Sequence, residues 1–275
     1  MKNLLPIIKT LLMLCLLSSM AYFGFTTYEE AKAYEHYTTQ IALACDADGL
    51  ASERIDQFTE IISLGLVKNE SKQQLEQLRT KQLTAKENAT QLLYYFFLAL
   101  AILILFAFTC TIQSAAMSLS LATFIALVYG LLNPILMVTI HKKVEYLGDV
   151  ILSFESKGII GSISKLYGEG ELAVAFTILL FSILIPVIKS LTLTFVLIFS
   201  NRDWNKKLVN FFKFIGKWSM IDVFVVATFL VYFTSNTGNI SSAEIQVGLY
   251  FFLTYVILSM ITAILTQKVL EQKTK

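Results

Sequence analysis

Two ionisable side chains within apolar segments are the residues with the clearest potential for chemistry. Lys189 follows Pro186 by three residues, and Asp222 follows Trp218 by four. If these segments cross a membrane, a charged group there is costly and points to a function. We predict that Lys189 and Asp222 face an internal, partly hydrated cavity, where they hold an anionic head group or relay a proton. The alternative is that Lys189 extends alone to the interface and Asp222 caps its helix.

Polar neighbours of Lys189 strengthen the first interpretation. Ser182, Pro186 and Lys189 are spaced by four and three residues, so they share one face of a helix. Pro186 removes a backbone hydrogen bond to the carbonyl of Ser182 and is expected to kink the helix. The freed carbonyl then requires water, a hydroxyl or a neighbouring helix. Ser182 is therefore a further candidate for lipid binding or proton relay.

Hydroxyl residues and a proline occur in similar positions in other apolar segments. Ser219 lies three residues before Asp222 and is expected on the same helix face. Pro134 is predicted to kink a second helix, where it would free the carbonyl of Gly130. Hydroxyl residues near the C-terminus are more typical of helix packing than of ligand binding. These are Thr254, Ser259 and Thr262.

Patterns for catalysis and for metal or cofactor binding are missing from the sequence. His36 and His141 have no second ligand at metal spacing, and the three cysteines are too far apart for a C-x-x-C pair. No nucleophile elbow, phosphate loop or H-E-x-x-H pattern occurs. We therefore expect no enzymatic activity, no metal and no cofactor.

The composition indicates what must position these residues. The 275 residues are 56% hydrophobic and only 15% charged, and residues 88–140 contain no Asp, Glu, Lys or Arg. One helix over that run would be about 80 Å long, more than twice the hydrocarbon core of a bilayer. The chain must cross, turn and cross again. This excludes a soluble globular enzyme, a secreted disulfide scaffold and a free nucleic-acid-binding domain.

The predicted fold class is an all-α integral membrane protein with about six transmembrane helices. The run over residues 88–140 is expected to break near Thr111–Ala115. The predicted spans are residues 8–27, 92–111, 116–140, 171–199, 218–235 and 244–267.

Basic residues predict the orientation. The loop over residues 201–217 carries five Lys or Arg residues against the single acid Asp203, and lysines also flank the first and last spans. Cytoplasmic loops carry such an excess, so both termini are expected in the cytoplasm. Residues 28–90 and 141–170 then lie outside. A cleaved signal peptide that ends near Ala21 is one alternative, and an uncleaved first helix is the other. We favour the uncleaved helix because apolar residues continue beyond Ala21.

The outer segment 28–90 is predicted to be a helical hairpin between the first two spans. Residues Asp46–Gly49 are a turn signal, and Ser71 with Gln74 has the spacing of a capping box. The simplest interpretation is a solvated hairpin on two membrane helices. The alternative is a surface that docks a partner or senses a signal.

Four blocks resemble the paraquat-inducible protein A family in the same order. They are KWSMIDVFVVA at 217–227, the S-K-G-I segment at 156–159, I-P-V-I-K-S at 185–190 and the last helix from residue 245. The resemblance covers about residues 112–271 and implies a four-helix transmembrane module. Residues 1–111 have no counterpart in the family, and the sequence pattern predicts an N-terminal membrane hairpin for them. Unlike many members, the chain has one module and no cysteine-rich zinc element.

The resemblance implies a protein of the Gram-negative inner membrane that works in envelope maintenance. Better-known members act with MCE proteins, which form lipid-conducting assemblies across the periplasm. The expected role is to load or extract phospholipid for such a partner, alone or as an oligomer. Lys189, Ser219 and Asp222 match motif positions and would line the polar part of the lipid pocket. The alternative is a non-transporting accessory or sensory subunit linked to envelope stress, which binds a partner through the outer hairpin.

Overall fold

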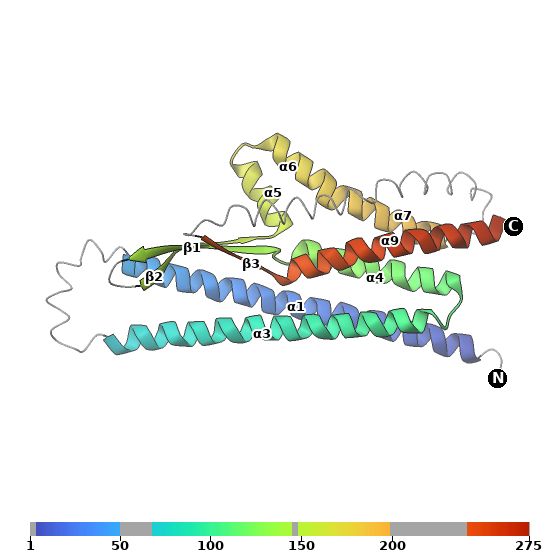
Figure 1. The fold of residues 1–275 in the computed structure, drawn as a ribbon, viewed down its shortest axis with the longest axis horizontal. Helices are drawn as coiled ribbons and strands as arrows, with labels where there is room; N and C mark the ends of the chain where they lie inside the picture. The colour runs from blue at the N-terminus through green and yellow to red at the C-terminus, as the bar shows by residue number, and fades with distance from the viewer. Residues whose placement is uncertain (1–3, 50–67, 145–147, 199–240, 275) are drawn as a thin grey trace.

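The computed structural model describes residues 4–49, 68–144, 148–198 and 241–274. The long helices run roughly along the long axis of an elongated molecule (Figure 1). The start of α1 and the end of α9 lie at one end, which we call the termini end. A small β-sheet lies toward the opposite end, which we call the sheet end.

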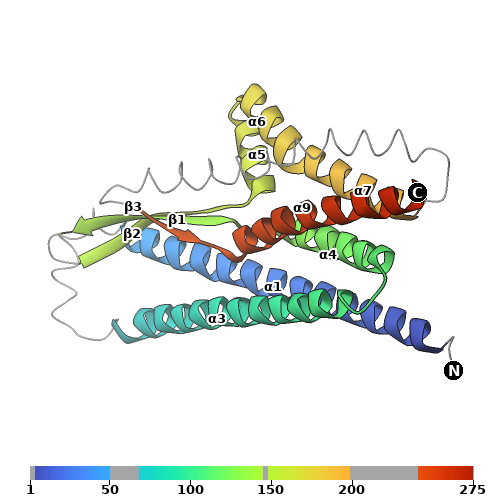
Figure 2. The same cartoon turned by 45° about the vertical axis from the view of Figure 1, so that its right-hand side comes forward.

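Helices α1 (Leu4–Gly49) and α3 (Lys68–Ala107) form a long pair that lies side by side in both views (Figures 1 and 2). Their 46 and 40 residues correspond to about 69 and 60 Å, so both exceed the hydrocarbon core of a bilayer. The predicted outward extension of the first span is present. Two predictions for this region are wrong: Asp46–Gly49 is helical as the end of α1 and not a turn, and Ser71 lies within α3, which already begins at Lys68, and does not cap it.

The two long helices pack through apolar residues that recur every three or four positions. Met13, Leu17 and Met20 of α1 and Leu93 and Phe96 of α3 are buried members of one hydrophobic core. The opposite faces expose large apolar side chains, including Leu105 of α3 at 68% of its maximal area. Such a face suits contact with acyl chains rather than with water.

Helices α4 (Ile112–Leu132) and α9 (Val247–Thr274) form a second pair with a very close backbone approach. At Gly130, a Cβ atom would lie 2.9 Å from the Cα atom of Phe252. A small residue that allows two helix backbones to approach so closely is typical of helix packing in membranes. The Phe251 ring of α9 also packs edge-on against Phe96 of α3 at 4.8 Å, which joins the two pairs.

A second contact joins α1 to α4. The ring of Tyr129 lies directly against Gly24, so that any side chain at this position of α1 would overlap the ring. The Tyr129 hydroxyl donates a hydrogen bond to the carbonyl of Ala21 at 2.8 Å. Ring and hydroxyl together fix α1 against α4.

The helix that carries Lys189 is irregular. It runs through α6 (Leu172–Ile178), a π-helical segment η3 (Leu179–Leu184) and α7 (Ile185–Ile198). The π-helical turns end just before Pro186, where the imide nitrogen cannot donate. π-Helical turns occur mostly as short insertions within α-helices and are frequent at functional sites.

A three-stranded sheet, which the sequence patterns did not predict, lies at the sheet end. Strands β1 (Leu136–Val144), β2 (Gly148–Lys157) and β3 (Ser241–Ile245) are antiparallel in the order β2-β1-β3. Helix α5 (Ile159–Gly168) follows β2. The sheet ties the outgoing end of α4 to the incoming end of α9.

Two predictions for the third span are wrong. The predicted helix over residues 116–140 ends at Leu132, and Leu136 already belongs to β1. Pro134 therefore follows α4 instead of kinking it. The carbonyl of Pro134 accepts a hydrogen bond from the backbone of Gly248 at 3.0 Å, and β-branched residues after it favour the strand.

Five described helical segments are long and apolar enough to cross a membrane, and they establish a helical, multi-pass membrane protein. They match the predicted spans in order, whereas the predicted span over residues 218–235 lies outside the described residues. The segments are Ile7–Ile41, Glu76–Ala107, Ile112–Leu132, Leu172–Ile198 and Val247–Gln272.

The close approach of α4 and α9 generates a stability prediction. Gly130→Ala places a methyl group against the backbone of Phe252, which cannot move aside as a flexible side chain would. We expect the free energy of unfolding to fall by about 1–3 kcal/mol, the usual cost of overpacking. Thermal unfolding of the detergent-solubilised protein measures it. Gly161→Ala is the control because a Cβ at Gly161 meets no atom within 4 Å. Equal melting temperatures for both variants would contradict the packing described here.

Candidate functional site

Lys189 lies inside the helical bundle and not on the surface that faces lipid. Its residue is 5% exposed, on the face of α7 that packs inward. The Nζ atom donates a hydrogen bond to Ser259 Oγ of α9 at 3.3 Å. The Ser259 hydroxyl in turn donates to the carbonyl of Val256 at 2.9 Å, so that its lone pairs are available to the ammonium group.

Two pairs of hydroxyl groups continue this polar contact between the helices. Ser120 Oγ of α4 lies 2.7 Å from Thr194 Oγ1 of α7. Thr123 Oγ1 of α4 lies 3.2 Å from Thr262 Oγ1 of α9. Helices α4, α7 and α9 thus meet along a set of polar side chains that we call the polar seam. Its members are Ser120, Thr123, Lys189, Thr194, Ser259 and Thr262.

The other predicted residues of this helix also lie on its buried face. Ser182 is 2% exposed, and Pro186 is buried. Ser190 is 1% exposed, and its hydroxyl has no hydrogen-bond partner among the described residues. A buried hydroxyl without a partner loses its hydration, so the region is suited to a polar ligand or a water molecule.

The side chains of the polar seam can bind polar groups and transfer protons. A lysine supplies a compact positive charge with three donors, which suits a phosphate group. Serine and threonine hydroxyls both donate and accept, so they can bind a head group or pass a proton. Across the described ranges, no group of three or more His, Cys, Asp or Glu residues could hold a metal ion.

The remaining sequence-based candidates are not brought to Lys189 by the described part of the chain. Asp222 and Ser219, with Trp218, lie outside the described residues, so their proposed proximity to Lys189 stays a prediction. Pro134 lies at the sheet end, in the connection from α4 to β1.

Several members of the polar seam were missed by the sequence analysis. The sequence pattern predicts Ser259 and Thr262 as packing residues, yet Ser259 contacts Lys189 directly. Ser120 and Thr123 are spaced by three residues, a signal that places both on one face of α4. Their partners on the other helices could not be inferred from spacing alone.

Comparison with known proteins supports one assignment. No curated protein sequence and no solved structure gives a significant match. The family model described as paraquat-inducible protein A matches residues 112–270, more than half of the chain, and includes every member of the polar seam. The resemblance predicted from the four sequence blocks is confirmed. The chain therefore belongs to the paraquat-inducible protein A family.

Proposed function

We propose that the chain is an inner-membrane component of intermembrane phospholipid transport. It loads or extracts phospholipid for a periplasmic partner of the MCE type, as its family resemblance implies. The observation that carries the proposal is the buried amine of Lys189, which is 5% exposed and bound to Ser259. A charge in this position is costly to retain, and a phosphate group that passes along the helices is a reason to retain it.

The geometry around Lys189 suggests how a head group would be held. The ammonium group of Lys189 attracts the phosphate. Ser259 on the facing helix α9 and Ser190, the next residue of α7, supply hydroxyl groups beside it. The irregular segment η3 lies one turn away on the same helix, where backbone hydrogen bonds are already rearranged. We expect the head group to enter beside this segment.

The same proposal implies a source of energy for transport and an orientation of the chain in the membrane. No nucleotide-binding motif occurs in the sequence, so the driving force would come from an ion gradient or from the partner. Both termini would lie in the cytoplasm, and the sheet end would face the periplasm, where an MCE-type partner is available. Asp222 would then tune the charge of Lys189 or take up a proton.

Replacing Lys189 tests the proposal. Lys189→Leu removes the charge at nearly constant volume, and hydrogen bonds to charged groups contribute about 1.5–3 kcal/mol. We expect about tenfold weaker retention of phospholipid, which corresponds to about 1.4 kcal/mol. The measurement is phospholipid per protein after purification in mild detergent, by phosphorus assay and mass spectrometry.

Lys268→Leu is the matched control, because Lys268 is an exposed lysine near the end of α9. Size-exclusion chromatography checks that both variants stay monodisperse. Wild-type lipid content together with full transport activity in Lys189→Leu would overturn the assignment of Lys189 to a lipid site.

The second candidate function is a non-transporting accessory or sensory subunit linked to envelope stress. The observation that favours it is the length of α1 and α3, which extends both helices well beyond a bilayer. A rigid helical pair that projects from the membrane offers a surface for a partner.

Deleting residues 30–88 and joining the two helices with a short linker separates the two functions. If the hairpin serves only to bind a partner, the shortened protein loses partner association in pull-down experiments and keeps its phospholipid. Loss of phospholipid with partner association intact would instead favour a direct part in transport.

A further inference from the structure

Helix α5 crosses the direction of the long helices instead of following it. In Figure 1, where the long axis is horizontal, α5 runs steeply between the sheet and the start of α6, and it is steep in Figure 2 as well. The helices that are long and apolar enough to cross a membrane follow the long axis. Helix α5 therefore lies across the membrane normal and not along it.

The start of α5 lies at the level where the neighbouring membrane helices begin or end. The 21 residues of α4 correspond to about 31 Å, which matches the hydrocarbon core of a bilayer. A Cβ atom at Gly158, the residue before α5, would lie 3.5 Å from the carbonyl oxygen of Asn133 at the end of α4. At the start of α9, the backbone of Gly248 donates to the carbonyl of Pro134. Helices α4, α5 and α9 thus share one boundary.

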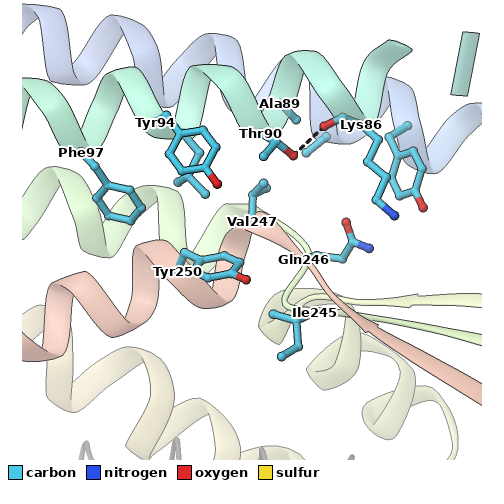
Figure 3. Close-up of a pocket in the computed structure, with 12 residues that line it drawn as sticks. Lys86, Ala89, Thr90, Tyr94, Phe97, Ile245, Gln246, Val247 and Tyr250 are labelled. Carbon is cyan, nitrogen blue, oxygen red and sulfur yellow. Dashed lines mark hydrogen bonds between the residues drawn. The ribbon is translucent and has the colours of Figure 1, made fainter. Parts of the chain in front are cut away.

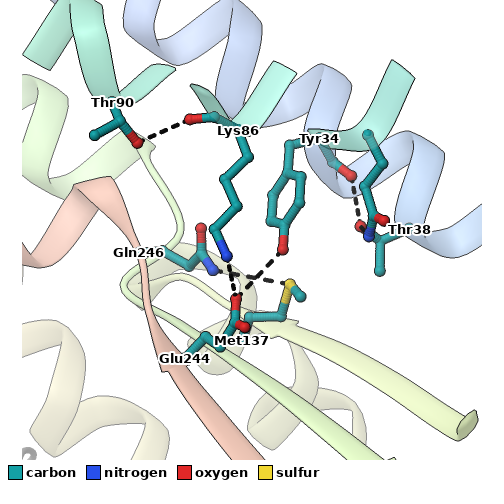
Figure 4. A network of polar contacts seen from close by, with 8 residues as sticks. Tyr34, Thr38, Lys86, Thr90, Met137, Glu244 and Gln246 are labelled. Carbon is teal, nitrogen blue, oxygen red and sulfur yellow. Dashed lines mark hydrogen bonds and ion pairs between the residues drawn. The ribbon is translucent and has the colours of Figure 1, made fainter. Parts of the chain in front are cut away.

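Residues on the opposite side of the bundle mark the same boundary. On its sheet side, Lys86 Nζ lies 2.8 Å from Glu244 Oε2, and these side chains are 44% and 47% exposed (Figure 4). On its membrane side, the rings of Tyr94, Phe97 and Tyr250 line a pocket between α3 and α9 (Figure 3). Exposed charges require water, whereas tyrosine rings are enriched at the interface of a bilayer. The boundary at which α5 begins is therefore the membrane surface nearest the sheet end.

The exposed surface of α5 has an apolar side and a polar side. Ile159 is buried in the hydrophobic core and defines the inward face. At 100° per residue, Ile160 and Tyr167 lie about 90° to one side of Ile159. Lys165 lies about 120° to the other side, where it forms an exposed ion pair with Glu169 at 4.0 Å. Ile160 is 49% exposed and Tyr167 is 70% exposed. A helix with this division is suited to the plane of a membrane interface.

The apolar side of α5 is continuous in the chain with a surface that faces lipid. Helix α6 begins the candidate span Leu172–Ile198, in which Leu172 and Phe176 are 58% and 60% exposed. The turn between α5 and α6 carries Glu169 and Glu171. Carboxylates are costly in hydrocarbon, so this turn limits the depth at which α5 can lie.

We propose that α5 is an interfacial anchor that inserts Ile160 and Tyr167 into the leaflet nearest the sheet end. The partner of this surface is the bilayer itself, at the boundary between head groups and acyl chains. The tyrosine ring is apolar and its hydroxyl is polar, which suits this boundary. Lys165, on the other side of the helix, faces the phosphate groups and water. The inference does not rest on the proposed function, because it concerns the surrounding bilayer and not a transported molecule.

The anchor has a consequence for the helix that carries Lys189. The 27 residues of Leu172–Ile198 correspond to about 40 Å, about 10 Å more than the hydrocarbon core, and a helix with this excess tilts. Figure 1 shows α6 and α7 oblique to the long axis. Because α5 holds the start of α6 at the membrane surface, it fixes this tilt and with it the depth at which Lys189 meets Ser259.

Electron paramagnetic resonance of spin labels tests the inference with the full chain in phosphatidylcholine vesicles. Ile160→Cys, Tyr167→Cys and Lys165→Cys are labelled one at a time, in a background in which the native cysteines are replaced by serine. The measured quantity is the ratio of label collisions with O₂, which concentrates among acyl chains, to collisions with a water-soluble nickel chelate. We expect this ratio to be at least threefold higher at positions 160 and 167 than at position 165.

Two positions on α3 provide the reference ratios. Leu105→Cys reports the acyl chains, because Leu105 is 68% exposed within a candidate span. Lys81→Cys reports water, because Lys81 is exposed on the part of α3 beyond the bilayer. Gly161→Cys is a second probe of the polar side that leaves the Lys165 ion pair intact, and a Cβ there meets no atom within 4 Å. Size-exclusion chromatography checks that every labelled variant stays monodisperse.

The reference ratios decide between the outcomes. Ratios at positions 160 and 167 near that of Leu105→Cys, with ratios at 161 and 165 near that of Lys81→Cys, support the anchor. Ratios at 160 and 167 equal to that of Lys81→Cys would overturn it, because the apolar side of α5 would then face water, as a surface for a protein partner does. Equal ratios at all four positions of α5 would also overturn it, because no side of the helix would then be inserted.

Discussion

The close contact of α4 with α9 is the constraint on which the rest of the described structure depends. At Gly130 the two backbones approach until a methyl group no longer fits. This approach brings Thr123 within hydrogen-bond distance of Thr262, and it leaves α7 to pack against both helices. Lys189 of α7 meets Ser259 of α9 where α7 packs against this pair. In a membrane, where burial of apolar side chains gives little net gain, close packing and hydrogen bonds between helices must supply the association energy.

The sheet at the opposite end extends the same constraint beyond the membrane helices. Strand β1 continues directly from α4 and strand β3 leads directly into α9, so their pairing holds the ends of the two helices together. Glu244 in β3 then reaches the N-terminal helical pair through Lys86 and Tyr34. The family-matched region and the two long helices that precede it are thereby joined by polar contacts at the sheet end and by aromatic packing further along.

The sequence was informative where charge and hydropathy alone decide the structure. The long uncharged run over residues 88–140 required a turn within it, and the helices indeed separate between Ala107 and Ile112. The inward position of Lys189 was also predictable, because a lysine so deep in an apolar segment needs polar surroundings. Both inferences rest on the cost of charge in hydrocarbon, which a single chain segment reveals without knowledge of its neighbours.

Features that depend on contacts between distant segments could not be predicted. Pro134 has the same type of sequence environment as Pro186, yet the first ends a helix and the second lies within one. The difference arises because Gln246 and Gly248, more than a hundred residues away, bind the backbone around Pro134 and draw it into a sheet. The pairing of Ser120 with Thr194 was hidden for the same reason, since periodicity assigns a residue to a face but not to its partner.

The contact of Tyr129 with α1 has a mechanical consequence. Because the ring occupies the space above Gly24 and the hydroxyl binds Ala21, sliding or rotation of α1 at this point would require Tyr129 to move, whereas a tilt about this point would not. Tyr34 lies about 17 Å along the helix from this pivot, so a tilt of about 5° would displace it by about 1.5 Å. A pull on the projecting end of α1 would thus be transmitted as a lever movement to the carboxylate of Glu244, while the helices near the pivot stay in place.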